Sequence, residues 1–171
     1  MKLTAQAEYG LRCILSLARA ELEAPSGITT GGSGRRALTV TEIAEREGLS
    51  EHYAGKLIRI LRRVGLVKSA LGRKGGYCLA RPAERISVRE VLLALGDKFF
   101  EPETCRRFPG KRECCVHLSD CAIRALWAAL QAHIDEVLSQ LTLKTLLGNE
   151  QSMAYRLQLH SPEIKLLKPE R

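Results

Sequence analysis

The stretch TEIAEREGLSEHYAGKLIRILRRVG, residues 41–65, holds the pattern that decides the fold. A short helix that begins at Thr41 is expected to end at Gly48, and Ser50 is placed to cap a second helix that runs to about Val64. Two helices joined by a short turn that contains a glycine form a helix-turn-helix. The sequence therefore predicts this motif at the centre of its N-terminal half.

The second of these helices has one apolar face and one basic face. The apolar face, with Leu57, Ile58 and Leu61, is expected to be buried. The basic face fits the major groove of duplex DNA, where residues near the helix N-terminus meet base edges and basic residues hold phosphates. From this helix and its cap, the residues that we expect to contact DNA are Ser50, His52, Tyr53, Lys56 and Arg59.

A β-hairpin is predicted directly after the second helix. Residues 66–69 and 77–80 alternate like two strands, and residues 72–76, Gly-Arg-Lys-Gly-Gly, form the turn between them. A glycine-rich tip lets the backbone approach the sugar-phosphate, and the two basic residues would neutralise phosphate charge or enter the minor groove. We expect this wing to contact DNA through Arg73, Lys74 and Gly75.

The positive charge of the chain is confined to the same region. Between Lys56 and Arg89 there are ten lysines and arginines and a single acid, Glu84, although the whole chain has a formal net charge of only +8. Such confinement favours an electrostatic footprint for a polyanion over an evenly solvated basic face. Aromatic residues make up only 5% of the chain, which argues against a base-stacking surface for single strands. Duplex DNA is therefore the expected partner.

Length and composition exclude several other classes of protein. The 171 residues, 45% of them apolar, are enough for one sizeable domain or for a small domain with an oligomerising element. No stretch is long enough to span a bilayer and the N-terminus lacks the layout of a secretory signal, so we expect a soluble, cytoplasmic protein with no membrane partner. An enzyme is not expected, because we find no paired nucleophile and base, no phosphate-binding glycine motif and no paired catalytic carboxylates.

Four of the six cysteines lie within 17 residues, at Cys105, Cys114, Cys115 and Cys121. In a reducing cytosol, grouped cysteines are more often metal ligands or redox thiols than structural disulfides. Thiolates are soft ligands suited to iron–sulfur clusters or to zinc, and basic residues of the same loop would offset the charge of an anionic cluster. The loop is therefore predicted to be a metal or iron–sulfur site.

Two long helices are predicted on either side of these sites. Residues 4–22 have apolar positions at helical spacing, with Thr4 as the cap. Residues 121–140 carry an apolar stripe that so small a domain cannot cover, so pairing with a second subunit is expected. His133 and Asp135 fall off this stripe and are predicted to be solvated.

The predicted fold is mainly α with a small β-wing (α+β), namely a winged helix-turn-helix domain followed by a long dimerisation helix. Cys13 and Cys78 fall within the first domain and are predicted to be packed or edge side chains. The expected segments are a DNA-binding domain at 1–96 with a flexible insertion at 24–37, a cysteine-rich loop at 97–121, a dimerisation helix at 122–147 and a weakly structured tail at 148–171.

Specific motifs extend along nearly the whole chain. They include Glu8-Tyr9-Gly10-Leu11-Arg12, Gly48-Leu49-Ser50, Gly65-Leu66-Val67-Lys68-Ser69 with Gly72-Arg73-Lys74-Gly75-Gly76-Tyr77, and the cysteine loop that leads into Cys121-Ala122-Ile123-Arg124-Ala125-Leu126-Trp127. Together they resemble the motifs of the winged helix-turn-helix iron–sulfur transcriptional regulators of the IscR, NsrR and RirA type.

The resemblance implies a homodimer on a partly palindromic operator, with an iron–sulfur cluster whose state controls DNA affinity. The family's last two ligand cysteines are separated by five residues, which selects Cys115 with Cys121 and leaves Cys105 as the first ligand. The alternative spacing through Cys114 stays open, because adjacent cysteines cannot be ranked from sequence. The cofactor implied is a [4Fe-4S] or [2Fe-2S] cluster, with [4Fe-4S] favoured.

The fourth ligand is where this chain departs from part of the family. IscR-like members carry a histidine three residues after the last cysteine, where this chain has Arg124. NsrR-like members can take a carboxylate from near the N-terminus of the partner subunit, and Glu8 matches that position. Glu8 is therefore our first choice. Cys114 and His117 are the local alternatives, and a low-molecular-weight thiol or water is another.

A second departure concerns base reading. IscR-like proteins carry a glutamate in the recognition helix and an arginine in the wing, where this chain has Gly55 and Leu71. Its operator should therefore differ from theirs. Gly55 weakens the helix by roughly 1 kcal/mol relative to alanine, and close approach to DNA would be a reason for it.

These observations predict a DNA-binding transcriptional regulator, acting as a repressor, whose operator affinity is controlled by an iron–sulfur cluster that senses iron, redox state or nitric oxide. One alternative is a cluster-free thiol or zinc regulator of the same fold. Another is an iron–sulfur or protein-interaction module that does not bind DNA.

Overall fold

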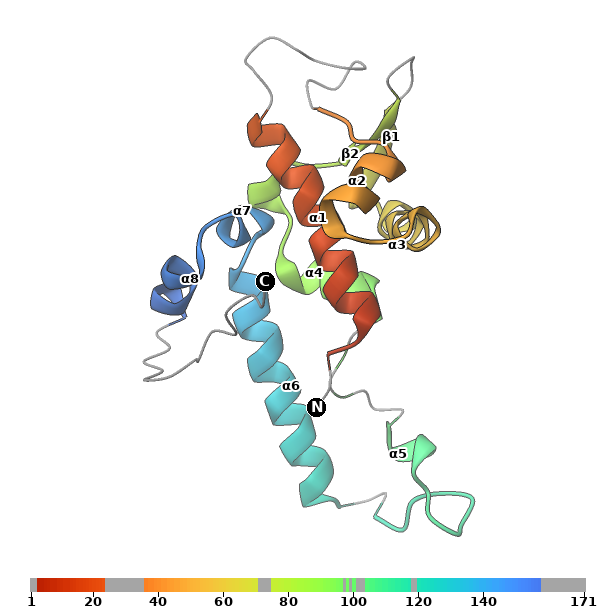
Figure 1. Cartoon of the computed structure of the whole chain (residues 1–171). Coiled ribbons are helices and arrows are strands. Elements are labelled where there is room, and N and C mark those ends of the chain that lie inside the picture. Colours follow the sequence, from red (N-terminus) through yellow and green to blue (C-terminus); the bar gives the residue numbers. More distant parts are fainter. Residues whose placement is uncertain are drawn as a thin grey trace, which may run out of the picture.

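A computed structural model describes residues 3–23, 36–70, 75–96, 98, 100, 104–117 and 120–157. Over these residues the chain is mostly helical, with a two-stranded antiparallel sheet (Figure 1), which confirms the predicted fold class. In chain order the elements are α1 (Ala5–Glu23), α2 (Val40–Glu47), α3 (Glu51–Arg63), β1 (Val67–Ala70), β2 (Gly76–Leu79), η1 (Ala83–Arg85), α4 (Val88–Ala94), α5 (Thr104–Arg107), α6 (Ala122–Gln140), α7 (Leu143–Leu146) and α8 (Glu150–Arg156).

The first helix of the predicted helix-turn-helix, α2, is fixed by caps at both ends. It follows Thr39 rather than beginning at Thr41, because Thr39 Oγ1 accepts the backbone N–H of Glu42 at 3.1 Å while Glu42 Oε2 accepts that of Thr39 at 2.7 Å. This capping box satisfies backbone donors that the helix itself leaves without a partner. Gly48 ends the helix at φ 65°, a left-handed conformation that glycine adopts without strain.

The second helix of the motif, α3, turns its apolar face inward as the sequence predicts. Ser50 caps it by accepting the backbone N–H of Tyr53 at 3.3 Å. Leu57, Ile58 and Leu61 are fully buried. They meet α1, which contacts both α2 and α3 and is itself capped by Thr4, as expected.

The wing is a two-stranded sheet extended by one bridge. β1 and β2 pair antiparallel with Val67 opposite Leu79, and Leu38 forms a further bridge with Tyr77 through backbone hydrogen bonds of 2.9 and 2.7 Å. A Cβ atom on Gly76 would lie 2.5 Å from the carbonyl oxygen of Leu38. Only glycine therefore lets the two backbones approach this closely.

A single cluster of buried side chains joins α1, α2, α3, the wing and α4. The chain returns to this core after α6. Leu143 of α7 is fully buried, and hydrogen bonds of 2.9 Å from Val88 N to Leu141 O and 3.0 Å from Leu143 N to Ile86 O attach the returning segment. Residues 141–147, which we expected to continue the dimerisation helix, instead pack against the DNA-binding unit.

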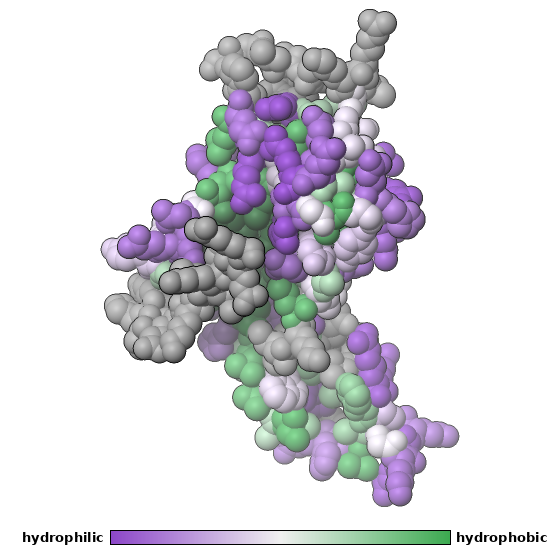
Figure 2. Space-filling model, in the orientation of Figure 1, coloured by the Kyte–Doolittle hydropathy of each residue, from purple (hydrophilic) through white to green (hydrophobic). Residues whose placement is uncertain are grey.

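α6 differs from the other long helices because none of its 19 residues is buried. In Figure 1 it extends away from the winged-helix unit toward the end of the molecule that carries α5. Figure 2 shows hydrophobic side chains over this lower part of the surface. The large apolar residues exposed along α6 are Ile123, Leu126, Trp127, Leu130 and Val137.

Two further findings concern the end of the chain and the membrane. Glu150–Arg156, within the segment that we expected to be weakly structured, forms helix α8 with Asn149 as its cap. Across the described residues, every helix is too short or too polar to cross a bilayer.

Candidate DNA interface and cysteine loop

The outer face of α3 carries the basic side chains that the sequence singled out. Lys56 and Arg59 are exposed, on the side of the helix opposite the buried leucines. The Nε atom of Arg59 donates to the carbonyl oxygen of Gly55 at 3.1 Å, which holds this side chain along the helix surface. Arg62 and Arg63 extend the same exposed surface toward the C-terminal end of the helix. The face can therefore present several guanidinium and ammonium groups to phosphates at once.

The N-terminal end of α3 differs in part from what we expected. His52 is exposed, but Tyr53 is half-buried and packs against the core. Its ring lies edge-on to the ring of Tyr9 on α1, with the two centroids 6.0 Å apart and the planes at 81°. Part of the Tyr53 ring therefore contacts α1 and is not directed toward a groove.

A buried polar network lies behind this contact. The guanidinium carbon of Arg12 sits 5.4 Å from the centre of the Tyr9 ring. Arg12 donates from Nε to Glu47 Oε2 and from Nη2 to Glu47 O, both at 3.0 Å, and the hydroxyl of Ser16 donates to Glu47 Oε1. Glu47 is only 8% exposed, and these bonds satisfy its carboxylate. No local sequence pattern indicates this network, because Arg12 and Glu47 are 35 residues apart.

Two arginines counted in the basic segment are held in ion pairs. Arg81 Nη2 donates to Glu90 Oε1 at 2.8 Å, and Arg89 Nη2 donates to Asp135 Oδ2 at 3.0 Å. Burial raises the pKa of Glu90, but hydrogen bonds from Arg81 and Ser87 outweigh this and hold that pKa below its ordinary value. The charge that this segment offers to DNA is therefore smaller than a count of basic residues implies.

The wing tip lies partly beyond what the structure describes. Arg73 and Lys74, together with Leu71, fall outside the described residues, so their contacts with DNA stay a prediction. Gly75 is half-buried and leads directly into β2.

The four cysteines of the loop are free thiols with different exposure. Cys105 on α5, Cys115 and Cys121 are half-exposed, and Cys114 is fully exposed. Cys121 is the N-cap of α6, where its Sγ atom accepts the backbone N–H of Arg124 at 3.4 Å.

The possible ligands are not gathered in this conformation. Within the described part of the chain, no three His, Cys, Asp or Glu side chains lie close enough together to hold a metal ion. Glu8 is exposed in the first turn of α1, and His117 is exposed in the loop.

The two cysteines outside the loop are buried, as predicted. Burial raises the pKa of Cys13 to about 12, and the nearby carboxylate of Glu47 adds to this, against the opposing effect of Arg12. The Cys13 thiol is therefore protonated at neutral pH and is a poor metal ligand.

The start of the cysteine loop is tied to α6 by a chain of hydrogen bonds. The backbone N–H of Phe100 donates to Gln131 Oε1, and Gln131 Nε2 donates to Asp135 Oδ1, both at 2.9 Å. Asp135 also receives the bond from Arg89, and its side chain is only 26% exposed. The prediction that Asp135 is solvated was therefore wrong, because a tertiary partner on α4 holds it. His133, also expected to be solvated, is 79% exposed.

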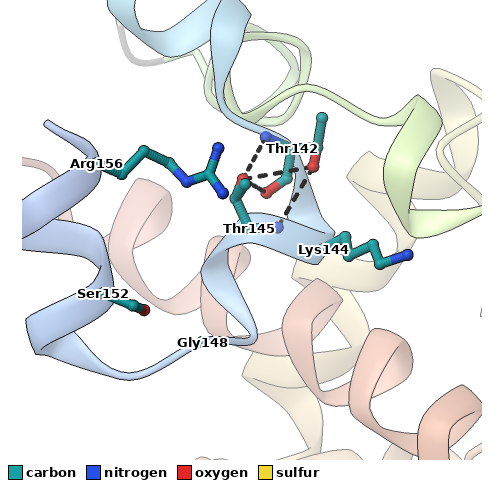
Figure 3. A pocket seen from close by; sticks show the side chains of 6 residues that line it. All are labelled: Thr142, Lys144, Thr145, Gly148, Ser152 and Arg156. Atoms are coloured by element: carbon teal, nitrogen blue, oxygen red, sulfur yellow. Dashed lines mark hydrogen bonds between the residues drawn. The ribbon is translucent and has the colours of Figure 1, made fainter.

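A polar hollow of about 340 Å³ lies between α7 and α8 (Figure 3). Its lining residues are Thr142, Lys144, Thr145, Gly148, Ser152 and Arg156. The two threonines bond each other's backbone N–H groups as a capping box, and Ser152 Oγ donates to the carbonyl of Asn149. Lys144 points away from the hydroxyls and donates to Glu84 at 2.8 Å. Because most of these groups already serve the fold, we assign no site here.

Comparison with known proteins identifies the relatives of this chain. A family model described as Rrf2, iron-dependent transcriptional regulator, matches residues 3–149. Protein rrf2 of Nitratidesulfovibrio vulgaris is 34% identical over 147 residues, which cover 86% of this chain and 87% of that protein. The HTH-type transcriptional regulator IscR of Photorhabdus laumondii is 32% identical over 151 residues, covering 88% and 82% of the two chains.

Solved structures give the same result. The structure of T. potens IscR has a TM-score of 0.63 at 28% identity and covers 94% of this chain and 93% of its own. CymR, the global cysteine regulator of B. subtilis, has a TM-score of 0.61 at 28% identity, with 85% and 95% covered. An oxidised form of CymR from Staphylococcus aureus matches at 30% identity with a TM-score of 0.58, covering 87% of this chain and 98% of its own.

Proposed function

The chain belongs to the Rrf2 family of transcriptional regulators, which are DNA-binding proteins and not enzymes. From this premise we propose that it is a homodimeric repressor whose affinity for a partly palindromic operator is controlled by an iron–sulfur cluster in the cysteine loop. The observation that carries the proposal is that the loop of free thiols ends in Cys121 at the N-terminus of α6, a helix with exposed apolar side chains and no buried residue.

DNA recognition is assigned to α3 and the wing. The exposed basic side chains of α3 would hold phosphates, and His52 at its N-terminal end would face base edges. Ser50 already caps α3 through its hydroxyl, and the half-buried Tyr53 can offer DNA only part of its ring. The proposed wing contacts are Arg73, Lys74 and Gly75.

Dimerisation is assigned to α6. An apolar face with Leu126, Trp127 and Leu130 exposed is costly in water, at about 25 cal/mol for each Å² of apolar surface. A second copy of the same helix would cover it. The two-fold axis of such a dimer would place two α3 helices on two half-sites of one operator.

The donor chemistry of the loop fits a cluster. Cys105, Cys115 and Cys121 supply soft sulfur ligands that are accessible from solvent. The basic residues of the loop, among them Arg106, Lys111 and Arg112, would offset the charge of an anionic cluster. Because the thiols are not gathered in the described conformation, the proposal includes a closing movement of the loop. A bound cluster would supply a group that responds to iron, oxidants or nitric oxide.

For the fourth ligand we propose Glu8 of the partner subunit. The exposed carboxylate in the first turn of α1 is free to reach a neighbouring chain without breaking the core. Cys114 and His117, both exposed in the loop, are the local alternatives.

A cluster-free thiol or zinc regulator is the second candidate function. The adjacent pair Cys114 and Cys115 favours it, because two neighbouring free thiols suit either redox chemistry or a soft metal. The likeness to CymR, whose structure is known in an oxidised form, also supports this candidate.

The test is the visible absorption spectrum with iron, sulfide and zinc analysis of the full chain purified without oxygen. We expect brown protein with matched iron and sulfide, which a C105A/C115A/C121A triple variant loses. The matched control is Cys114→Ala, which should retain the colour. Colourless protein that stays free of iron after anaerobic reconstitution would overturn the cluster, and bound zinc in that protein would select the alternative.

DNA binding is tested separately by fluorescence anisotropy over a range of salt concentrations. Binding through phosphate contacts predicts a logarithmic affinity that falls linearly with the logarithm of salt concentration. We expect Arg59→Ala to weaken binding and to reduce this slope by about one.

A further inference from the structure

α6 is held against the winged-helix unit by polar bonds. None of its residues is buried, so hydrophobic packing holds it less firmly than it holds the helices of the core. Two of its side chains, Asp135 and Gln131, form hydrogen bonds that connect it to the rest of the molecule. Asp135 Oδ2 accepts from Arg89 of α4 at 3.0 Å, and Asp135 Oδ1 accepts from Gln131 at 2.9 Å.

α4, in contrast, is a fixed part of the DNA-binding unit. Its residue Val91 and its C-cap Leu95 are buried in the common core. Gln6 of α1 donates from Nε2 to the carbonyl oxygen of Leu95 at 2.6 Å. The ion pair between Arg89 and Asp135 therefore links a helix that cannot move within the core to a helix that lacks such packing.

Gln131 also connects α6 to the cysteine loop. Gln131 Oε1 accepts the backbone N–H of Phe100 at 2.9 Å. Cys105 follows Phe100 by only five residues, a span of at most about 18 Å of chain. A movement of the loop that displaces Phe100 would remove its hydrogen bond to Gln131. Gln131 and Arg89 both donate to the carboxylate of Asp135, so this loss is next to the ion pair with α4.

We propose that Gln131 and Asp135 are positioning residues that set the angle of α6 against α4, and through it the separation of the two DNA-reading helices in the dimer. A change in the conformation of the cysteine loop would alter that angle by displacing Phe100. This inference rests on the dimer and the loop switch of the proposed function. It assigns the coupling between the cysteine loop and operator affinity to three side chains, Arg89, Gln131 and Asp135. The proposed function gives none of these three a contact with the operator or with a cluster.

The chemistry of Asp135 allows a substitution that removes one of its two hydrogen bonds. Both carboxylate oxygens accept a hydrogen bond, whereas an amide has a single acceptor oxygen. Asp135→Asn therefore breaks one of the two bonds at almost unchanged size. Glu136→Gln is the matched control, since it makes the same chemical change at the next residue, whose side chain is 68% exposed and lies 4.0 Å from His133 of its own helix.

The first measurement uses the operator that the wild-type protein selects from a randomised duplex library. Affinity is measured for that operator, for versions with the half-sites moved by one base pair, and for an isolated half-site. We expect wild type and E136Q to discriminate among spacings. D135N should lose most of this discrimination while its half-site affinity stays unchanged, a result that a general loss of stability would not give. Asp135→Glu, which keeps both acceptors, should restore it.

The second measurement is the ratio of operator affinities with the loop loaded and unloaded. Allosteric couplings are typically about 5- to 150-fold, and we expect the wild-type ratio to fall below about twofold in D135N. Should D135N fail to fold, Gln131→Met removes the link to Phe100 at similar size and serves in its place. A folded, dimeric variant with wild-type spacing discrimination and a wild-type ratio would overturn the proposal.

The two proposals fail in different ways. If the wild-type dimer shows no difference between loaded and unloaded states, the sensing function is wrong, and the spacing experiment still decides whether Asp135 positions the heads. A monomeric wild-type protein would overturn both proposals. If D135N keeps the wild-type ratio of operator affinities between loaded and unloaded states, the sensing function stands, but these residues do not carry the coupling.

Discussion

The helices of the winged-helix unit and α6 both carry an apolar face, but only those of the winged-helix unit bury it. α3 buries Leu57, Ile58 and Leu61 completely against α1, whereas α6 leaves Leu126 and Leu130 exposed. The difference is one of partners, because the core of the first is supplied by its own chain. In the proposed dimer, a second copy of the chain would cover the apolar face of α6. The contrast teaches that the core of the winged-helix unit is made within the chain, whereas no residue of α6 is buried by it.

This contrast also separates the tasks of the two regions. A well-packed unit can present a rigid helix to DNA, because its side chains are held by neighbours on several sides. A helix without buried residues, such as α6, is held less firmly, since exposed ion pairs each contribute only about 0–1 kcal/mol. The proposed division of tasks, with signal sensing beside α6 and DNA reading on the winged-helix unit, agrees with this difference.

The largest expected effect comes from removing a core side chain. Leu57→Ala should lower the free energy of unfolding by about 2–5 kcal/mol, because Leu57 is fully buried and its removal leaves a cavity. Urea denaturation followed by circular dichroism measures this loss. Leu126→Ala on α6 is the comparison, and measured at concentrations where the chain is monomeric it should cost no more than about 0.5 kcal/mol. Equal losses at the two sites would break the contrast.

The next effect concerns assembly. Leu130→Asp places a charge on the apolar face of α6 and should raise the dissociation constant of the dimer by about 10- to 100-fold. Sedimentation analysis over a range of concentrations measures it. His133→Asp introduces the same side chain off that face, where residue 133 is already exposed, and should leave the dimer intact. An unchanged dimer in L130D would show that α6 does not form the interface.

A smaller effect separates stability from DNA binding at Gly55. Alanine should stabilise α3 by up to about 1 kcal/mol, and its Cβ would lie 3.6 Å from Val40 Cγ1, an ordinary contact. If close approach to DNA is the reason for the glycine, G55A should unfold at a higher temperature and yet bind operator more weakly. Thermal denaturation and fluorescence anisotropy test this together. Unchanged operator affinity would mean that the glycine has no role at the DNA surface.

The smallest effect comes from the cap of α2. Hydrogen bonds from the backbone and side chain of Thr39 hold the pKa of Glu42 below its ordinary value of 4.5. Since the folded-state pKa is lowered, the cap's contribution, about 0.5–1 kcal/mol, is present above pH 4.5 and lost as the pH falls through the lowered value.

Urea unfolding at several pH values tests this prediction. Glu42→Gln can still accept the bond from the Thr39 N–H, so it should keep most of the stability and lose this part of the pH dependence. Glu45→Gln removes a charge from the same helix outside the cap and should keep the wild-type dependence. A full acid response in E42Q would refute the assignment.

The helices and their caps were predictable because they depend on neighbours in the sequence. Thr4, Ser50 and Gly48 act where the local pattern placed them, and the buried positions of α3 follow from apolar spacing alone. The start of α2 was predicted one residue too late, at Thr41 instead of Val40. The local signal for the correct start is the capping box that Thr39 forms with Glu42, three residues later.

Two tertiary contacts near the candidate site were not predicted. Asp135 was expected to face water and is instead held by Arg89 of α4, and the ring of Tyr53, whose contact with DNA stays a prediction, packs on Tyr9 of α1. Arg89 and Asp135 are 46 residues apart, and nothing in the sequence near either one indicates the other. Predictions for Arg73 and Lys74 fall outside the described residues.

The sequence by itself determined which segments are helical, which face of each is apolar, where the thiols and basic residues are concentrated, and the family to which the chain belongs. These properties depend on residue type and short-range spacing. Only the tertiary structure decided which charges are neutralised in ion pairs, that α7 returns to the core, and that α6 is left without a cover. Those outcomes depend on contacts between residues distant in the chain, and such contacts exist only after the core has brought its helices together.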